Sequence, residues 1–423
     1  MPSQPRITIV GAGPSGLTLA VLLHRRSIPF TVYELRSRPT PEELSKPSGM
    51  LDLHEESGLA AIRACGLFDE FSPLTSECAE SMKIADRTGN VLYEDEGQQE
   101  GRPEISRHNL TKLLLSHLPE ESIKWNHKLI SATPSTTTEI TLQFTTNGHT
   151  MEVTADLVIG ADGAWSRTRK HLLTPIQPAY TGVQWITCTI VGITAKYPHL
   201  SDLVGPGSFC ALGACNGVMT QRGVQDSCRV YLAISTDDEH WGATAGFSGN
   251  TAAQIKDTLL SDDTYYGTWG DTMKEMIEVS CDEETAQSTA ARADKKGGDG
   301  EVDIKPLYML PIGHTWDHKP GVTAIGDAAH LMTPFAGEGV NMAMWDALSL
   351  YEAIASACDK GEQFMETLDP LLREFEKTMA ERAGDRAKKS WKNKNMMMGE
   401  TGAEDMANMF IGFQQMMAQG PPQ

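Results

Sequence analysis

Residues 322–347 read VTAIGDAAHLMTPFAGEGVNMAMWDA, and this pattern predicts a strand, a loop and a helix. Val322 to Ile325 is a short apolar run with β-branched residues, which is typical of a buried strand. Asp327 follows, and a glycine-rich loop leads to apolar residues at helical spacing from Val340 onward. Such a turn presents backbone N–H groups and the positive end of a helix dipole. We therefore expect an anionic or electron-rich group there, the alternative being an ordinary connection between a strand and a helix.

The N-terminus repeats this arrangement and favours a cofactor over the ordinary connection. RITIV (6–10) predicts a strand, GAGPSG (11–16) places its glycines in the GxGxxG positions, and a second strand ends at Glu34. In a complete strand–helix–strand unit these glycines permit a tight turn and a close approach of the backbone to a pyrophosphate. Glu34 lies 18 residues beyond Gly16, where a carboxylate can bind both hydroxyls of an adenosine ribose.

The composition excludes several classes of protein. The 423 residues are enough for two or three domains, and the net charge of −20 argues against nucleic acid and anionic membranes as partners. No apolar run approaches the roughly 18 residues of a membrane helix, and a strand begins almost at the N-terminus, so we expect no signal peptide. Eight scattered cysteines without a CxxC pair favour reduced thiols in a cytoplasmic protein.

The middle of the chain adds a third turn and a different sheet. SRHNLTKLLLSHL (106–118) predicts a helix with Arg107 in its first turn, where a cation opposes the helix dipole. We expect Arg107 to point at an external anion, the alternative being a solvated surface side chain. Residues 151–159 predict one strand leading into GADG (160–163) with Asp162. Residues 183–193 and 208–234 predict antiparallel strands, followed by two short helices at 252–260 and 273–279.

His314 and His318 stand four residues apart, as metal ligands on a helix can. Gly313 and Pro320 favour a loop instead, and no third ligand is evident, so the sequence predicts no metal site. A long charged helix (371–394) and a methionine-rich tail (396–417) are interpreted as packing elements.

Together, GAGPSG with Glu34, GADG with Asp162 and GDAAH with Asp327 resemble the three cofactor turns of the FAD-dependent aromatic hydroxylases. These are flavoprotein monooxygenases of the para-hydroxybenzoate hydroxylase type. The resemblance covers nearly the whole chain and is weakest from about 180 to 300. Within that group the chain most resembles the tetracycline-inactivating flavin monooxygenases. The matching stretches are GMLDLHEESGLAAIRACGLF (49–68), PEISRHNL (103–110) and GDAAHLMTPFAGEGVN (326–341).

The resemblance implies non-covalent FAD and a role for each matching position. Glu34 would hold the ribose, Asp327 the ribityl or pyrophosphate region, and Asp162 would touch FAD and assist NADPH. Pro334 and Gly337 would lie near the isoalloxazine, where the start of the following helix would stabilise the reduced, anionic flavin. The residues assigned to FAD are Gly11, Ala12, Gly13, Pro14, Ser15, Gly16, Glu34, Asp52, Arg107, Asp162, Asp327, Gly337, Gly339, Val340 and Asn341.

The sequence also departs from these relatives. Their NADPH-binding arginine aligns near Ser45, which leaves Lys46 as the NADPH candidate, and Glu338 stands where glutamine is frequent. A substrate-contacting glutamine falls near Thr187. Other polar substrate contacts do not align cleanly, which leaves Asn216 and Gln221 as substrate candidates.

We therefore predict an α/β flavoprotein with a discontinuous FAD-binding Rossmann-type domain (1–180 and 311–360). An α+β substrate domain with an antiparallel sheet (181–310) and a C-terminal helix and tail (361–423) complete it. NADPH or NADH would reduce FAD, and a C4a-hydroperoxide formed with O2 would hydroxylate an aromatic or polycyclic small molecule. A Baeyer–Villiger or epoxidising enzyme on the same fold and a non-catalytic flavin-binding protein are the alternatives. We expect a monomer or weak dimer without nucleic-acid or membrane partners.

Overall fold

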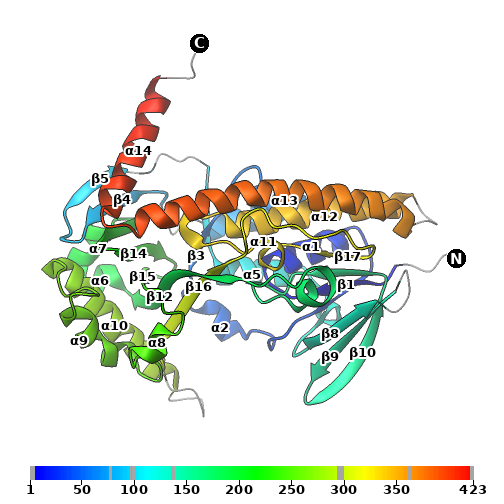
Figure 1. The fold of residues 1–423 in the computed structure, drawn as a ribbon, viewed down its shortest axis with the longest axis horizontal. Coiled ribbons are helices and arrows are strands. Elements are labelled where there is room, and N and C mark those ends of the chain that lie inside the picture. The colour runs from blue at the N-terminus through cyan, green and yellow to red at the C-terminus, as the bar shows by residue number, and fades with distance from the viewer. Residues whose placement is uncertain are drawn as a thin grey trace.

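The first layer of the molecule is a parallel sheet that gathers strands from distant parts of the sequence (Figure 1). The computed structural model describes residues 5–75, 79–95, 97, 101–134, 139–292, 300–360 and 364–419. The strand order is β17-β11-β1-β2-β7, and all four neighbouring pairs are parallel. The strands are β1 (Ile7–Val10), β2 (Phe30–Tyr33), β7 (Ile123–Lys124), β11 (Leu157–Gly160) and β17 (Val322–Ala324). The carboxyl ends of β1, β11 and β17 therefore meet at one edge, and the three predicted turns follow there.

Helices cover this sheet in two further layers. The helix α1 (Pro14–Arg25) packs against α12 (Gly339–Asp359), and α13 (Phe364–Met397) packs on the outside of α12. Figure 1 shows α13 running along the length of the molecule above α12. The predicted helices at 106–118 and from Val340 are confirmed as α5 (Arg107–Ser116) and α12. The smaller helices here are α2 (Pro41–Ser45), α3 (Gly58–Ala64), α4 (Phe68–Phe71), α11 (Asp327–His330), and the short turns η1 (Ser72–Leu74), η2 (Glu120–Ser122), η3 (Arg169–Leu173) and η4 (Pro334–Ala336).

A three-stranded antiparallel sheet and a two-stranded ribbon complete this half. They comprise β8 (Lys128–Pro134), β9 (Ile140–Thr146) and β10 (His149–Ala155), and β3 (Met50–Asp52) with β6 (Glu104–Ser106). The prediction of one strand over 151–159 is wrong, because β10 ends at Ala155 and β11 begins in a different sheet. At the break, Asp156 Oδ2 accepts from the backbone N–H of Arg6 at 2.8 Å, which ties the crossing chain to the start of β1.

The second half is built on a seven-stranded sheet in the order β16-β12-β15-β14-β13-β4-β5. The predicted antiparallel strands are confirmed, although β13 and β4 pair in parallel and residues 82–95 supply two strands of this sheet. Its strands are β4 (Met82–Asp86), β5 (Val91–Asp95), β12 (Ala179–Val191), β13 (Ser208–Gly213), β14 (Asn216–Gly223), β15 (Ser227–Ser235) and β16 (Asp303–Met309).

The two faces of this sheet have different surroundings. One face packs its aliphatic residues against α9 (Ala252–Ser261) and α10 (Asp271–Arg292) in a closed apolar core. The short helix predicted at 273–279 is wrong in length, because α10 spans 22 residues. The other face lies towards α14 (Gly402–Gln419) and the loop before α12, with methionine and aromatic side chains. The remaining helices are α6 (Ile193–Lys196), α7 (Pro198–Val204) and α8 (Trp241–Thr244).

The first half of the methionine-rich tail packs as expected, whereas Phe413 and Met416 in its second half are exposed. The beginning of α14 lies on β4, β5 and β13 through Ala403, Met406 and Ala407, while its end projects from the body (Figure 1). Within the described ranges, every helix is too short or too polar to cross a lipid bilayer.

Candidate active site

The turn after β1 is closed by its own neighbours. Gly11 has a φ of +108°, and a Cβ there would lie 2.2 Å from the carbonyl oxygen of Ala161. A Cβ on Gly16 would lie 2.1 Å from the carbonyl oxygen of Gly11. Gly13 is different, since nothing lies within 4 Å of the position its Cβ would take. Two glycines are therefore required by the packing of the turn, and the third faces open space beside the start of α1.

Glu34 closes this turn from the end of β2. Its Oε2 accepts from the backbone N–H of Ala12 at 2.7 Å, and its Oε1 accepts from that of Arg36 at 2.9 Å. A carboxylate has about four acceptor positions, so further hydrogen bonds from sugar hydroxyls remain possible. The residues of this turn fit the ribose and pyrophosphate of a dinucleotide, as the sequence predicts.

The second glycine turn leads into α12. Gly337 is left-handed with a φ of +66°, and a Cβ there would lie 3.4 Å from Asp52 Oδ1. Nothing lies within 4 Å of a Cβ placed on Gly339, the first residue of the helix. Neither α1 nor α12 has a side-chain cap, so both helix starts keep backbone N–H groups for an acceptor. We call residues 333–338 the flavin loop, because the resemblance predicts that they lie near the isoalloxazine.

Asn341 has a buried side chain that binds protein groups. Its Oδ1 accepts from the backbone N–H of His54 at 2.8 Å and from Ser57 Oγ at 3.1 Å. Its Nδ2 donates to the carbonyl of Asp52 at 2.8 Å. The side chain thus fixes the segment after β3 to α12. The whole residue is buried, so the prediction that Asn341 contacts FAD is not supported.

The flavin loop is held from outside by α13, which sequence reasoning missed. Ser390 Oγ donates to the carbonyl of Thr333 at 2.5 Å, and Asn393 Nδ2 donates to that of Phe335 at 3.0 Å. Glu338 is 2% exposed and forms ion pairs with Arg386 at 3.0 Å and Lys389 at 3.2 Å. These residues recur at helical spacing on one face of α13. The long charged helix therefore turns part of its polar face inward. The helical spacing of these polar residues is the signal in the sequence from which the contact with the loop could have been predicted.

Asp327 begins α11 at the carboxyl end of β17. Its side chain is accessible, yet the surrounding protein raises its pKa by desolvation, against the opposing charges of His330 and Arg107. Burial also lowers the pKa of His330, but the charge and hydrogen bond of Asp346 outweigh that effect and raise it. His330 Nε2 and Asp346 Oδ2 are 2.5 Å apart, and Arg382 pairs with the other oxygen at 3.1 Å.

The positive charge of Arg107 acts on two groups. Burial raises the pKa of both Asp327 and Tyr231, and the charge of Arg107 opposes this rise at each of them. Arg107 itself is exposed at the first turn of α5, where Ser106 Oγ accepts from the N–H of Asn109 at 3.1 Å. Its exposed position is compatible with the prediction that Arg107 points at an external anion, and the assignment of that anion to FAD stays a prediction.

The third turn is built around Asp162 and a buried arginine that the sequence pattern did not single out. Asp162 accepts from Ser166 Oγ at 2.5 Å and from the backbone N–H groups of Arg167 and Thr168. Arg169 is fully buried and donates to the carbonyls of Ala328 at 2.7 Å and Ala164 at 2.8 Å. The carboxylate of Asp162 thus shapes its own turn, and Arg169 joins that turn to α11.

The face of the seven-stranded sheet that lies towards α14, which we call the open face, carries an aromatic cluster. The ring of Trp185 lies 4.9 Å from Tyr231 edge-on and 5.7 Å from Phe335 of the flavin loop. Because paired residues of antiparallel strands share a face, Thr187 lies beside Tyr231 on this side. Gln221 lies there too, and it accepts from the N–H of Met50 and donates to Glu104.

Asn216 is turned the other way. It pairs with Ile234 of the closed core, and its Nδ2 donates to the carbonyls of Thr264 and Tyr265 at 3.1 and 2.9 Å. The expectation that Asn216 contacts a substrate is therefore not supported, because the two-residue period of β14 points its side chain away from the aromatic cluster.

Lys46 follows α2, and its side chain is half exposed with Glu42 as a neighbour at 3.8 Å. The carbonyl of Lys46 accepts from His108 Nδ1 at 2.9 Å, which places the segment beside α5. The NADPH role of Lys46 stays a prediction.

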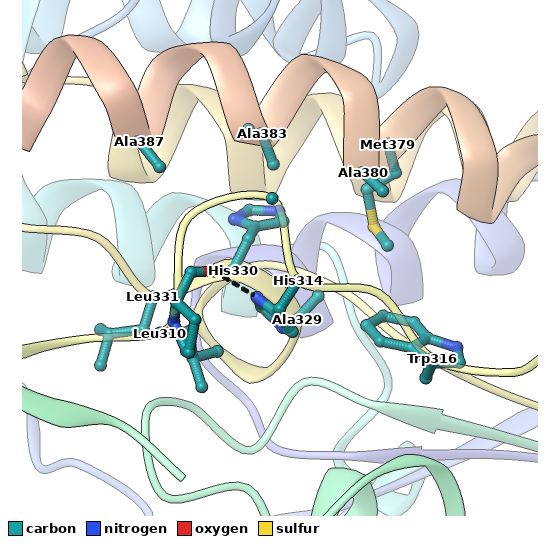
Figure 2. Close-up of a pocket in the computed structure, with 13 residues that line it drawn as sticks. Leu310, His314, Trp316, Ala329, His330, Leu331, Met379, Ala380, Ala383 and Ala387 are labelled. Carbon is teal, nitrogen blue, oxygen red and sulfur yellow. Dashed lines mark hydrogen bonds between the residues drawn. The ribbon is translucent and has the colours of Figure 1, made fainter. Parts of the chain in front are cut away.

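The two histidines considered as metal ligands bind protein groups. His314 Nδ1 donates to the carbonyl of Pro311, and His318 lies between Glu376 at 2.7 Å and Asp369 at 2.9 Å. No cluster of three metal-ligating side chains occurs in the described part of the chain. Figure 2 shows a cavity between α11 and α13, with Ala383 and Ala387 on one side and Leu331 on the other. Its volume is about 20 Å³, which suits a single water rather than a cofactor.

The comparisons with known proteins agree with this geometry. The model of the FAD binding domain family matches residues 5–382. This chain belongs to that family. The predicted resemblance to flavoproteins of the para-hydroxybenzoate hydroxylase type is thereby confirmed, and FAD is the cofactor. The assignment of FAD to the three turns stays a prediction.

Relatives of this FAD-binding chain are monooxygenases. Monooxygenase penA from Penicillium thymicola is 37% identical over 96% of this chain and 98% of its own length. Monooxygenase asqM from Emericella nidulans is 34% identical over 95% of this chain and 97% of its own. The tetracycline destructase Tet(55) shares the fold, with a TM-score of 0.67, 16% identity, and coverage of 98% of this chain and 96% of that one. The chain is a flavin-dependent oxidoreductase of the monooxygenase type.

Proposed function

We propose that this enzyme uses NADPH or NADH and O2 to insert one oxygen atom into an aromatic or polycyclic small molecule. The observation that carries the proposal is the cluster of Trp185 and Tyr231 against Phe335 of the flavin loop. Aromatic rings favour edge-on and offset contacts with other rings, so such a cluster suits an aromatic ligand beside the flavin. The monooxygenases penA and asqM support the reaction class.

Bound FAD would supply the oxygen chemistry, in which NAD(P)H provides two electrons, one oxygen atom of O2 goes to the substrate and the other leaves as water. The protein binds and orients the reactants. Arg107 and Asp52 would contact the flavin, Thr187 and Gln221 remain substrate candidates, and Lys46 remains the NADPH candidate. A cytoplasmic monomer or weak dimer with the domain boundaries given above belongs to the same proposal.

The test begins with purified protein and a panel of aromatic compounds. We expect bound FAD that acid releases, NAD(P)H oxidation that an aromatic substrate accelerates, and one atom of ¹⁸O from ¹⁸O2 in the product. Oxygen derived from water, or a product without added oxygen, would contradict the proposal. The same mass spectrum distinguishes hydroxylation from Baeyer–Villiger ring expansion or epoxidation after fragmentation.

A matched pair of variants locates the substrate. Trp185→Phe should raise KM for the aromatic substrate several-fold, because it removes part of the ring surface beside the flavin loop. Trp269→Phe makes the same change in the closed core on the opposite face, where Trp269 is 3% exposed. It should leave KM unchanged. Equal effects of the two variants would place the substrate elsewhere.

A further inference from the structure

His54 lies between two carboxylates beside the flavin loop. Its Nε2 donates to Asp52 Oδ2 at 2.9 Å, and its Nδ1 faces Glu338 Oε2 at 3.8 Å. The imidazole is 7% exposed and Glu338 is 2% exposed, so the ring and the second carboxylate are both shielded from bulk water. An imidazole with an acidic partner at each nitrogen can take up a proton on one side and release it on the other.

The two ends of this row reach different surroundings. The side chain of Asp52 is 35% exposed and lies under Gly337, at the part of the flavin loop predicted to face the isoalloxazine. At the other end, Glu338 is paired with Arg386 and Lys389 of α13, and the side chain of Lys389 is 53% exposed. The row therefore leads from the flavin pocket to the protein surface.

The row is held in place by groups that do not titrate. The amide of Asn341 accepts from the backbone N–H of His54 and donates to the carbonyl of Asp52, which fixes both residues relative to α12. The 3.8 Å gap between His54 and Glu338 exceeds a hydrogen bond by less than 1 Å. A rotation of the Glu338 carboxylate can close it.

We propose that Asp52, His54 and Glu338 form a proton relay between the surface and the flavin pocket. The inference rests on the proposed function, in which NAD(P)H, one proton, O2 and the substrate give NAD(P)⁺, the oxygenated substrate and water. Each turnover thus consumes one proton, which has to reach the reacting groups beside the flavin. The proton reaches His54 Nδ1 from the Glu338 side, and the proton on Nε2 passes to Asp52 and into the pocket.

Glu338 gives this relay its outer end. Glutamine is frequent at this position in the family that the chain resembles, and a glutamine amide could not carry a proton between Nδ1 and the surface. The other charged groups around the row are Arg386 and Lys389 on α13 and Glu56, which lies 3.8 Å from Arg386. Glu338 thus lies between His54 and the two cations of α13, of which Lys389 is half exposed to solvent.

The experiment compares two relay variants with a matched control in the FAD-loaded protein. His54→Gln removes the titrating ring, and Glu338→Gln keeps the shape of the outer end without its charge. His318→Gln is the control, because His318 is also a shielded imidazole between two carboxylates, Glu376 and Asp369, and contacts neither the flavin loop nor Asp52 in any described interaction.

The first measurement is the midpoint potential of bound FAD from about pH 5 to pH 8, the range in which imidazoles titrate. A two-electron couple shifts by about 30 mV per pH unit for each proton taken up. We expect His54→Gln to have a shallower slope than wild type, by up to this amount, because its ring can no longer bind a proton when the flavin is reduced. The slopes of Glu338→Gln and His318→Gln should match wild type.

The second measurement is the rate at which dithionite-reduced enzyme is reoxidised by O2 with substrate present, in H2O and D2O. Glu338→Gln and His54→Gln should slow the solvent-isotope-sensitive step about tenfold, whereas His318→Gln should not. An unchanged potential slope in His54→Gln, or unchanged reoxidation in Glu338→Gln, would overturn the relay. If His54→Gln no longer binds FAD, the reoxidation rate of Glu338→Gln alone decides whether the relay exists. Failure of wild type to oxidise NAD(P)H would refute the proposed function, while the dithionite potentials would still test the relay.

Discussion

The turn after β1 and the flavin loop both present glycines and a bare helix start, but different parts of the molecule hold them. The turn after β1 is fixed by its neighbours in the same sheet, since Gly11 and Gly16 touch the backbone at Ala161 and Gly11. The flavin loop is fixed by α13, through Ser390, Asn393 and the ion pairs of Glu338. One turn is rigid because of close backbone packing, and the other depends on side chains that come from about fifty residues further along the chain.

The difference indicates which turn can move. A turn closed by backbone contacts at 2.1–2.2 Å from a hypothetical Cβ has no room for change. A neutral hydrogen bond across a helix interface can be rearranged at a cost of about 1 kcal/mol, and one to a charged group at about 1.5–3 kcal/mol. We therefore expect the pyrophosphate turn to act as a fixed anchor and the flavin loop to respond to changes in α13.

The largest effect should come from breaking the rigid turn. Gly16→Ala places a Cβ 2.1 Å from the carbonyl of Gly11, so we expect a loss of about 3 kcal/mol or more in the free energy of unfolding of the apoprotein. Gly412→Ala on α14, where nothing lies within 4 Å, is the control and should be nearly neutral. Urea unfolding of both variants measures this. A stable Gly16→Ala protein would show that the turn is not tightly packed.

The second effect tests how the turn at Gly326 is held from a distance. Asp346 Oδ2 accepts from the N–H of Gly326 at 3.0 Å and pairs with His330 and Arg382. Asp346→Asn should cost about 3 kcal/mol near pH 6, because it leaves buried cationic partners without their carboxylate.

The pH dependence of this loss has a definite sign. Burial alone would lower the pKa of His330, but Asp346 raises it above 6.5, so the contribution of His330 is present below that pH and lost as pH rises through the raised value. Burial alone would raise the pKa of Asp346, but His330 and other partners lower it below 3.8, so its contribution is lost as pH falls through the lowered value. Melting curves should therefore show the largest difference between wild type and Asp346→Asn from roughly pH 4 to pH 6.5. A loss that grows above pH 8 would contradict this assignment.

Glu34→Ala tests the carboxylate that closes the rigid turn. We expect FAD affinity to fall by about 1.5–3 kcal/mol, the range for charge-assisted hydrogen bonds. Isothermal titration of the apoprotein with FAD measures the change. Glu42→Ala is the control, since its side chain is 74% exposed and pairs only weakly with Lys46. Unchanged affinity in Glu34→Ala would place the ribose elsewhere.

The smallest effects separate binding from folding. Gly13→Ala and Gly339→Ala add a methyl group where nothing lies within 4 Å, so the melting temperature of the apoprotein should stay within about 2 °C. FAD affinity should fall about tenfold in both, because the backbone could no longer approach a phosphate or a flavin closely. A matching loss in the apoprotein would mean that these glycines serve the fold, as Gly11 and Gly16 do.

The sequence by itself determined the features that depend on local pattern. Strand, glycine turn and helix follow one another in 6–25 and 322–359, and the carboxylates Glu34 and Asp327 stand at strand ends, because these patterns need only the periodicity of neighbouring residues and the lack of a Cβ. The family and its FAD cofactor follow from the same residues. Boundaries such as the break at Asp156 were missed, since a continuous apolar run does not reveal which sheet each half will join.

The tertiary structure decided which side chains from distant segments meet. Asn216 points into the closed core, whereas Gln221 on the same strand lies on the open face. The alternation of side chains along a strand is visible in the sequence, but which of the two faces is buried depends on what packs against the sheet. The tertiary structure also brought α13 against the flavin loop and placed His54 between Asp52 and Glu338. The first set of contacts joins residues about fifty positions apart, and the contact of His54 with Glu338 joins residues nearly 300 positions apart. The distances follow from the packing of α12 and α13 rather than from any local pattern.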